Sequence, residues 1–144
     1  MATTATLTLA SADIAGDPVS VTKTATLTKA GTINDLDQSI GLNRIHLRST
    51  TNKTLLTANA EGNDLAAKVY IVNKATDSTI YLTVTINAQT IGKLYAGDWM
   101  LMPWSQTDTA ASIEVAATNW TSSTGDIPVE YALFHEDTDF LTNA

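Results

Sequence analysis

The sequence contains no cysteine, so neither a disulfide framework nor a thiolate metal site is available to its 144 residues. Charged side chains are scarce at 16% of residues, and the 15 acidic residues outnumber the 8 basic ones. The net charge of −7 repels phosphate backbones and anionic lipid, so we expect neither nucleic acid nor a membrane as a partner. No apolar run is long enough to span a membrane, and the N-terminus lacks the basic and apolar regions of a signal peptide.

Sequence motifs for catalysis are missing as well. The chain has no glycine-rich phosphate loop, no H-E-x-x-H and no G-x-S-x-G. Its two histidines, His46 and His135, match no recognisable site motif, and histidines of this kind on strands are usually structural. The acidic stretch 34–38 could hold a cation, but it lacks the ordered ligands of a calcium loop, and we interpret it as a solvated loop. We therefore expect no enzyme, no catalytic residue, no cofactor and no metal ion.

Threonine takes the place of the missing charges, with twenty-five residues spread along the chain. Threonine is β-branched and well solvated, so it suits exposed strands. Short runs rich in β-branched and aromatic residues alternate with turn residues, and no amphipathic helix is evident. The spacing predicts an all-β fold of about eight to ten strands, an antiparallel, jelly-roll-like β-sandwich.

The strongest pattern lies between residues 68 and 104, where four such runs follow one another and predict an antiparallel meander. Strict alternation places Ile80, Leu82, Val84 and Ile86 on one face, and we expect these four side chains to be buried together. Pro103 cannot donate to a strand ladder, so its strand ends there or lies at the edge of a sheet.

Patterning divides the chain into three parts. Residues 1–40 form an extended, threonine-rich segment with one or two peripheral strands, which we expect to reach a neighbouring subunit or a larger shell as an added strand. Residues 41–136 form the sandwich. Residues 137–144 form an acidic C-terminal tail.

Two groups of side chains are candidates for an interface. Arg44, His46 and Arg48 project from one face of an alternating strand, either as a basic stripe that meets an acidic partner or as an ordinary solvated face. Among the tryptophans, Trp120 is the best candidate for exposure because it lies between polar residues. An exposed tryptophan could stack on a sugar or anchor a protein interface, whereas core packing is its commoner role.

From Ala66 onward, four runs carry a resemblance to a known class of proteins: V-Y-I-V-N-K, L-T-V-T-I, I-G-K-L-Y-A-G-D-W and P-W-S. They resemble small structural proteins of tailed-phage virions, which carry a V-Y-I-x-N strand, a hairpin and an L-x-A-G-D/E turn. The run A-T-L-T-K-A-G-T at residues 25–32 is similar to the threonine-rich leader of such proteins. This class has no catalytic or ligand-binding motif, so the resemblance transfers no site residues.

The resemblance implies a structural role in the virion, as a capsid decoration protein, a head fibre or a tail component, and the missing signal peptide predicts synthesis in the host cytoplasm. The resemblance favours a capsid decoration or cement protein that forms a homotrimer and binds the phage major capsid protein or other virion proteins. The alternative is a receptor- or glycan-binding module of a phage tail or fibre. A cement protein needs a broad contact surface, whereas a glycan binder needs a concave site with exposed aromatic rings.

Overall fold

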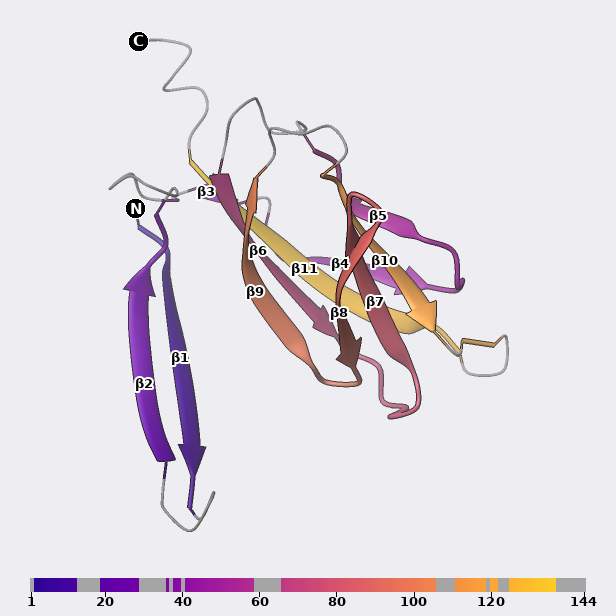
Figure 1. The fold of residues 1–144 in the computed structure, drawn as a ribbon, viewed down its shortest axis with the longest axis horizontal. Helices are drawn as coiled ribbons and strands as arrows, with labels where there is room; N and C mark the ends of the chain where they lie inside the picture. Colours follow the sequence, from indigo (N-terminus) through magenta and orange to yellow (C-terminus); the bar gives the residue numbers. More distant parts are fainter. Residues whose placement is uncertain are drawn as a thin grey trace, which may run out of the picture.

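In the computed structural model of the chain, every described strand pairs in antiparallel fashion, and the described residues include no helix (Figure 1). The predicted all-β antiparallel sandwich is confirmed. Structure is described for residues 2–12, 19–28, 36, 38–39, 41–58, 66–105, 111–118, 120–121 and 125–136. The predicted acidic tail 137–144 lies outside these residues, as does the acidic stretch 34–38 apart from Leu36 and Gln38.

Strand pairing in the sandwich is nested, the first strand with the last and so on inward, as a jelly-roll-like fold requires. The four pairs are β4 (Asn43–Leu47) with β11 (Ile127–His135), β5 (Lys53–Leu56) with β10 (Ile113–Thr118), β6 (Ala66–Asn73) with β9 (Trp99–Ser105), and β7 (Tyr81–Ile86) with β8 (Gln89–Tyr95).

The pairs join into two sheets, which we name after their central strands. The β10 sheet has the strand order β5-β10-β7-β8. In the β11 sheet the order is β11-β6-β9, with β4 on the other side of β11. The short β3 (Gln38–Ser39) continues the edge made by β4, because it pairs with the last residues of β11. Each sheet is therefore four strands wide, and the two pack face to face.

The meander predicted over residues 68–104 is wrong. Only β7 and β8 form a hairpin, closed by a two-residue turn in which Asn87 and Ala88 have φ of 50° and 58°. β6 pairs with β9 instead, so the chain crosses between the sheets after β6 and again after β8. The physical reason is burial, since a single meander leaves its apolar face in water, whereas two separated pairs can cover each other's apolar faces.

The core lies between the sheets, and the predicted alternating face is at its centre. Ile80, Leu82 and Val84 are almost completely buried, as predicted, whereas Ile86 is half-buried at the margin. The strand pairing is irregular at this point, because Val84 pairs with Gly92 while Thr85 pairs with Thr90, which leaves one extra residue in β8, a β-bulge. Thr85 is buried beyond this irregularity.

Asn73, at the end of β6, links the two sheets through a side-chain hydrogen bond. Its side chain is 0% exposed, and Nδ2 donates a hydrogen bond of 3.0 Å to the carbonyl of Leu94 in the opposite sheet. Oδ1 accepts a hydrogen bond of 2.9 Å from the backbone N–H of Ala75. The backbone N–H of Asn73 donates to the carbonyl of Asp98, and its carbonyl accepts from Gly97. All four polar groups of this buried residue are therefore satisfied.

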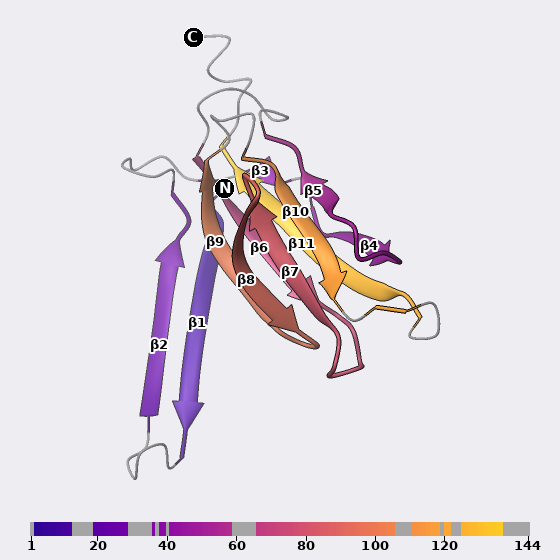
Figure 2. The same cartoon turned by 45° about the vertical axis from the view of Figure 1, so that its right-hand side comes forward.

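β1 (Thr4–Ser11) and β2 (Val19–Thr26) form a separate hairpin that stands apart from the sandwich beside β9 (Figures 1 and 2). Among the described strands they pair only with each other. At the base of the hairpin, Leu27 and Leu36 are buried. Backbone hydrogen bonds link Leu27 to Thr3 and Leu36 to Leu27. The rest of the hairpin is a projecting ribbon.

Candidate interaction surfaces

The predicted basic stripe lies on the outer side of the β11 sheet, where acidic side chains neutralise it. Arg44 is directly opposite Glu130 on β11, and the two form an ion pair. Arg48, which follows β4, donates two hydrogen bonds to Asp126, with Nε–Oδ1 and Nη2–Oδ2 distances of 2.7 and 2.8 Å. His46 lies 3.9 Å from the same carboxylate. The three residues thus share one surface, but they present paired charges, and their role in an interface stays a prediction.

These ion pairs change the pKa values of the two acids, but they contribute little to the stability of the fold. The hydrogen bond from Arg48 lowers the pKa of Asp126, and the hydrogen bond from Arg44 lowers the pKa of Glu130. Both arginines are exposed, so solvent and salt screen the attraction, and exposed pairs of this kind contribute little to stability. Their main effect is to hold the long arginine side chains along the sheet surface.

The tryptophans differ in exposure from the prediction. Trp104 is buried and its Nε1 donates a 2.7 Å hydrogen bond to the carbonyl of Ala111. Trp120 is half-buried against the core, and its Nε1 donates a 2.7 Å hydrogen bond to the carbonyl of Gly125. Trp99 is instead the exposed tryptophan, with 53% of its surface accessible. The expectation that Trp120 is the most exposed is therefore wrong.

Trp99 belongs to a continuous apolar surface that the sequence analysis missed. Strand register aligns Val72 with Trp99 and Tyr70 with Leu101, and it aligns Ala132 of β11 with Tyr70. The rings of Tyr70 and Trp99 have centroids 6.4 Å apart. We call this surface the outer apolar face of the β11 sheet. It comprises Tyr70, Val72, Trp99, Leu101, Pro103, Ala132 and Phe134, and Lys68 lies on the same side between Phe134 and Pro103. Trp99 and Leu101 are its most exposed large apolar side chains, at 53% and 38%, whereas Val72 and Ala132 are buried within it.

The position of this face in the sandwich makes it unusual. The outer side of a sandwich sheet normally carries polar residues, because only the inner side is covered by the other sheet. The outer side of the β10 sheet is mixed: Thr83 lies 3.4 Å from Thr118, Oγ1 to Oγ1, and Lys93 lies over the ring of Tyr81, which also contacts the exposed ring of Tyr95. The β9 edge carries Pro103, which confirms that this strand lies at the edge of its sheet.

The β1–β2 hairpin has two faces of opposite character, because residues paired across an antiparallel ladder project to the same side. One side carries only threonine, alanine and serine, and the hydroxyls of Thr6 and Thr24 lie 2.9 Å apart. The other side is apolar except for Lys23 and Ser11, and Leu9 is 51% exposed there. We call it the hairpin apolar face. Its apolar members are Ala5, Leu7, Leu9, Val19, Val21 and Ala25.

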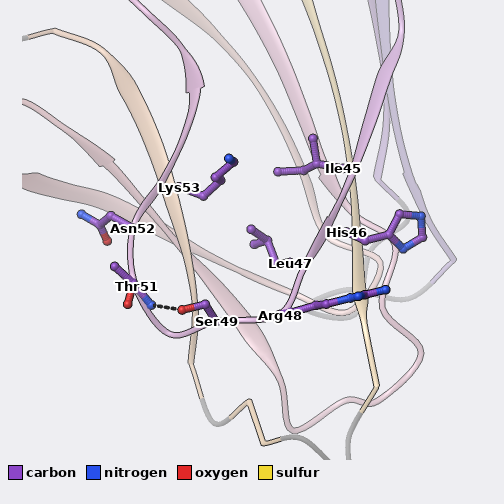
Figure 3. Close-up of a pocket in the computed structure, with 8 residues that line it drawn as sticks. All are labelled: Ile45, His46, Leu47, Arg48, Ser49, Thr51, Asn52 and Lys53. Atoms are coloured by element: carbon purple, nitrogen blue, oxygen red, sulfur yellow. Dashed lines mark hydrogen bonds between the residues drawn. The ribbon is translucent and has the colours of Figure 1, made fainter.

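A cavity of about 310 Å³ opens between the edge strands β4 and β5 (Figure 3). Leu47 and Lys53 point into it, while His46 and Arg48 point away from it (Figure 3). Among the residues that the structure describes, no three histidines, cysteines or acids lie close enough to hold a metal ion. The second histidine of the chain, His135, lies away from this cavity. It is buried at the end of β11, with Nδ1 2.8 Å from the carbonyl of Glu136. The cavity is therefore lined by both apolar and polar side chains, and its lining shows no arrangement of catalytic groups.

The described residues include no helix long and apolar enough to cross a membrane. Comparison of the chain with models of known protein families and with curated proteins finds no match.

Proposed function

We propose that the chain is a structural virion protein, a decoration or cement protein that binds the outer shell of a tailed-phage head as a homotrimer. The observation that carries this proposal is the pair of apolar faces, one on the hairpin and one on the β11 sheet, exposed on an otherwise well-buried sandwich. Large exposed apolar patches mark interaction sites in soluble proteins. The resemblance to tailed-phage virion proteins supplies the setting.

Low charge density supports assembly through broad contacts. Charged residues make up 16% of the chain, so few charges must lose water when strand faces meet another surface. Arg44 and Arg48 are already paired with acids of their own chain, which reduces the cost of covering them further. The stripe of Arg44, His46 and Arg48 is our candidate for the contact with an acidic surface of the shell, whose carboxylates would share or replace Glu130 and Asp126 as partners of the arginines.

A glycan- or receptor-binding module of a tail or fibre is the second candidate. The exposed ring of Trp99, close to the ring of Tyr70, favours it, because such rings can stack on sugars. Sugar sites are usually concave, however. Trp99 lies on a sheet face, and neither the cavity of Figure 3 nor the smaller one of about 130 Å³ near Lys74 is lined by a tryptophan.

The test is binding of purified full-length protein to undecorated capsids, with copies per particle counted by quantitative mass spectrometry. We expect saturable binding with many copies per particle, and at least tenfold weaker binding for the double variant Arg44→Gln, Arg48→Gln. The control Lys93→Gln removes a charge from the outer side of the other sheet and should bind like the parent. No capsid binding, together with glycan binding that Trp99→Ala abolishes, would replace this proposal with the second candidate.

A further inference from the structure

The β1–β2 hairpin has an apolar face, as a sheet of a sandwich does, but no second sheet covers that face. A two-stranded hairpin is marginally stable in water, and independent stability needs further strands or a packed apolar face. Both strands of this hairpin are eight residues long, and Leu7, Leu9, Val19 and Val21 on its apolar face are 37–51% exposed. Only its base carries a buried apolar residue, Leu27, so the apolar side of the ribbon is exposed along its length.

The outer apolar face of the β11 sheet is a surface of matching kind. It is formed mainly on β6 and β9, which have eight and seven residues, close to the length of the hairpin strands. Two sheets pack with their faces about 10 Å apart, so a two-stranded ribbon fits over two strands of a sheet. Lys23 is the single charged side chain on the hairpin apolar face, and its long stem can carry the ammonium group to the rim.

We propose that the hairpin apolar face of one copy packs on the outer apolar face of the β11 sheet of a second copy. The chain carries both surfaces, and in both views its own hairpin diverges from its own sandwich instead of covering it (Figures 1 and 2). One contact between two copies covers the hairpin apolar face of one copy and the outer apolar face of the β11 sheet of the other. This pairing rests on the self-assembly in the proposed function, but it does not depend on which shell the protein coats.

The area involved favours a closed assembly. Eight residues of strand span roughly 27 Å and two strands cover a width of roughly 10 Å, so one docked hairpin buries about 270 Å² on each partner. One docking therefore removes about 540 Å² from water, below the ~1,000 Å² expected of a specific interface. In a closed ring every copy donates one hairpin and receives another, so removing one copy breaks two contacts, about 1,080 Å² in all, which reaches the size expected of a specific interface.

Cross-linking can test directly whether the hairpin of a second copy covers the β11 sheet, because the chain has no cysteine of its own and introduced cysteines are the only thiols. Leu9→Cys on one batch of full-length protein and Leu101→Cys on another are mixed and treated with a short bismaleimide. We expect a cross-linked dimer in the mixture, at least tenfold more than when Thr8→Cys, on the threonine face, replaces Leu9→Cys. A chain that carries both Leu9→Cys and Leu101→Cys shows whether the contact forms within one copy. Cross-linking only within that chain, or none in the mixture, overturns the proposal.

Sedimentation of charge variants gives a second, independent measurement. Leu9→Lys lies far from the core and should weaken self-association at least tenfold, while Thr8→Lys on the opposite side of the same strand should not. Equal self-association of the two variants overturns the pairing. The result is separable from the proposed function: cross-linking without capsid binding removes the shell assignment alone, and capsid binding without cross-linking removes this pairing alone.

Discussion

Asn73 offers the sharpest test of how the two sheets are held together. Asn73→Ala removes the hydrogen bonds to the Leu94 carbonyl and from the Ala75 N–H, at 3.0 and 2.9 Å. A buried polar group left without its partner costs about 1–3 kcal/mol. Two such groups and the small cavity left by the amide lead us to expect a loss of about 2–5 kcal/mol in the free energy of unfolding.

Asn73→Asp changes the same site without changing its volume. The carboxylate retains an acceptor for Ala75 but cannot donate to Leu94, and burial raises its pKa above the unfolded value of about 3.9. The folded variant then binds more protons than the unfolded chain, so its stability falls as the pH rises. Once protonated, the group can donate to Leu94 again. We therefore expect the deficit relative to the parent to be small near pH 4 and largest near pH 7.

Urea denaturation followed by tryptophan fluorescence at pH 4 and pH 7 measures both effects. Asn87→Asp is the matched control, because Asn87 is exposed in the β7–β8 turn and the same substitution there should cost less than about 0.5 kcal/mol at either pH. An Asn73→Asp variant as stable as the parent at pH 7, or an Asn73→Ala variant within about 0.5 kcal/mol of it, would refute the bridge between the sheets.

Two further predictions concern the core and the charged edge. Leu82→Ala should lower the free energy of unfolding by about 2–5 kcal/mol, because Leu82 is 0% exposed. In thermal denaturation the control Thr83→Ala, at the half-buried neighbouring position, should melt much closer to the parent, and equal melting of the two variants would contradict the assigned register. Asp126→Asn removes the acid paired with Arg48. Since pairing lowers the pKa of Asp126, its contribution to stability is present above the unfolded pKa of about 3.9 and is lost as the pH falls through the lower folded value. The stability difference between parent and variant should therefore shrink only below about pH 4 and vanish below the folded pKa, and a difference that grows on acidification would contradict this.

Strand positions could be predicted from this sequence because alternation is a local signal. Leu82 and Val84 are buried because every second residue of a strand points to the same side, and that rule needs no knowledge of partners. The pairing of β6 with β9 instead of β7 could not be predicted this way, because it depends on which apolar faces cover each other. The one local sign of the crossing is Asn73, a polar residue at the end of an apolar run, whose side chain is used across the sheets.

Exposure of the tryptophans was mispredicted for a related reason. Trp120 has polar neighbours in sequence, yet its ring packs on the core and its indole N–H has a backbone partner. Trp99 follows a turn and begins a strand with alternating large apolar residues on both sides, so the sequence does not tell which side is covered. Trp104, on the other side of that strand, is buried. Which of these two tryptophans is buried depends on which side of β9 faces the other sheet, and that is set by the position of β9 in the fold.

In the β1–β2 hairpin, the alternation of each strand is too weak to predict a core strand, yet pairing of the two strands produces an apolar face. Leu7 and Leu9 are separated by threonines, so the segment has an apolar side that is too small to anchor a core. Register then adds Val19 and Val21 to the same side, and the combined face is twice as wide as either strand predicts alone. An apolar face assembled in this way but left uncovered in one copy has a physical reason to exist only if something outside that copy covers it. The bare face of the β11 sheet is the surface of the same chain that fits it best.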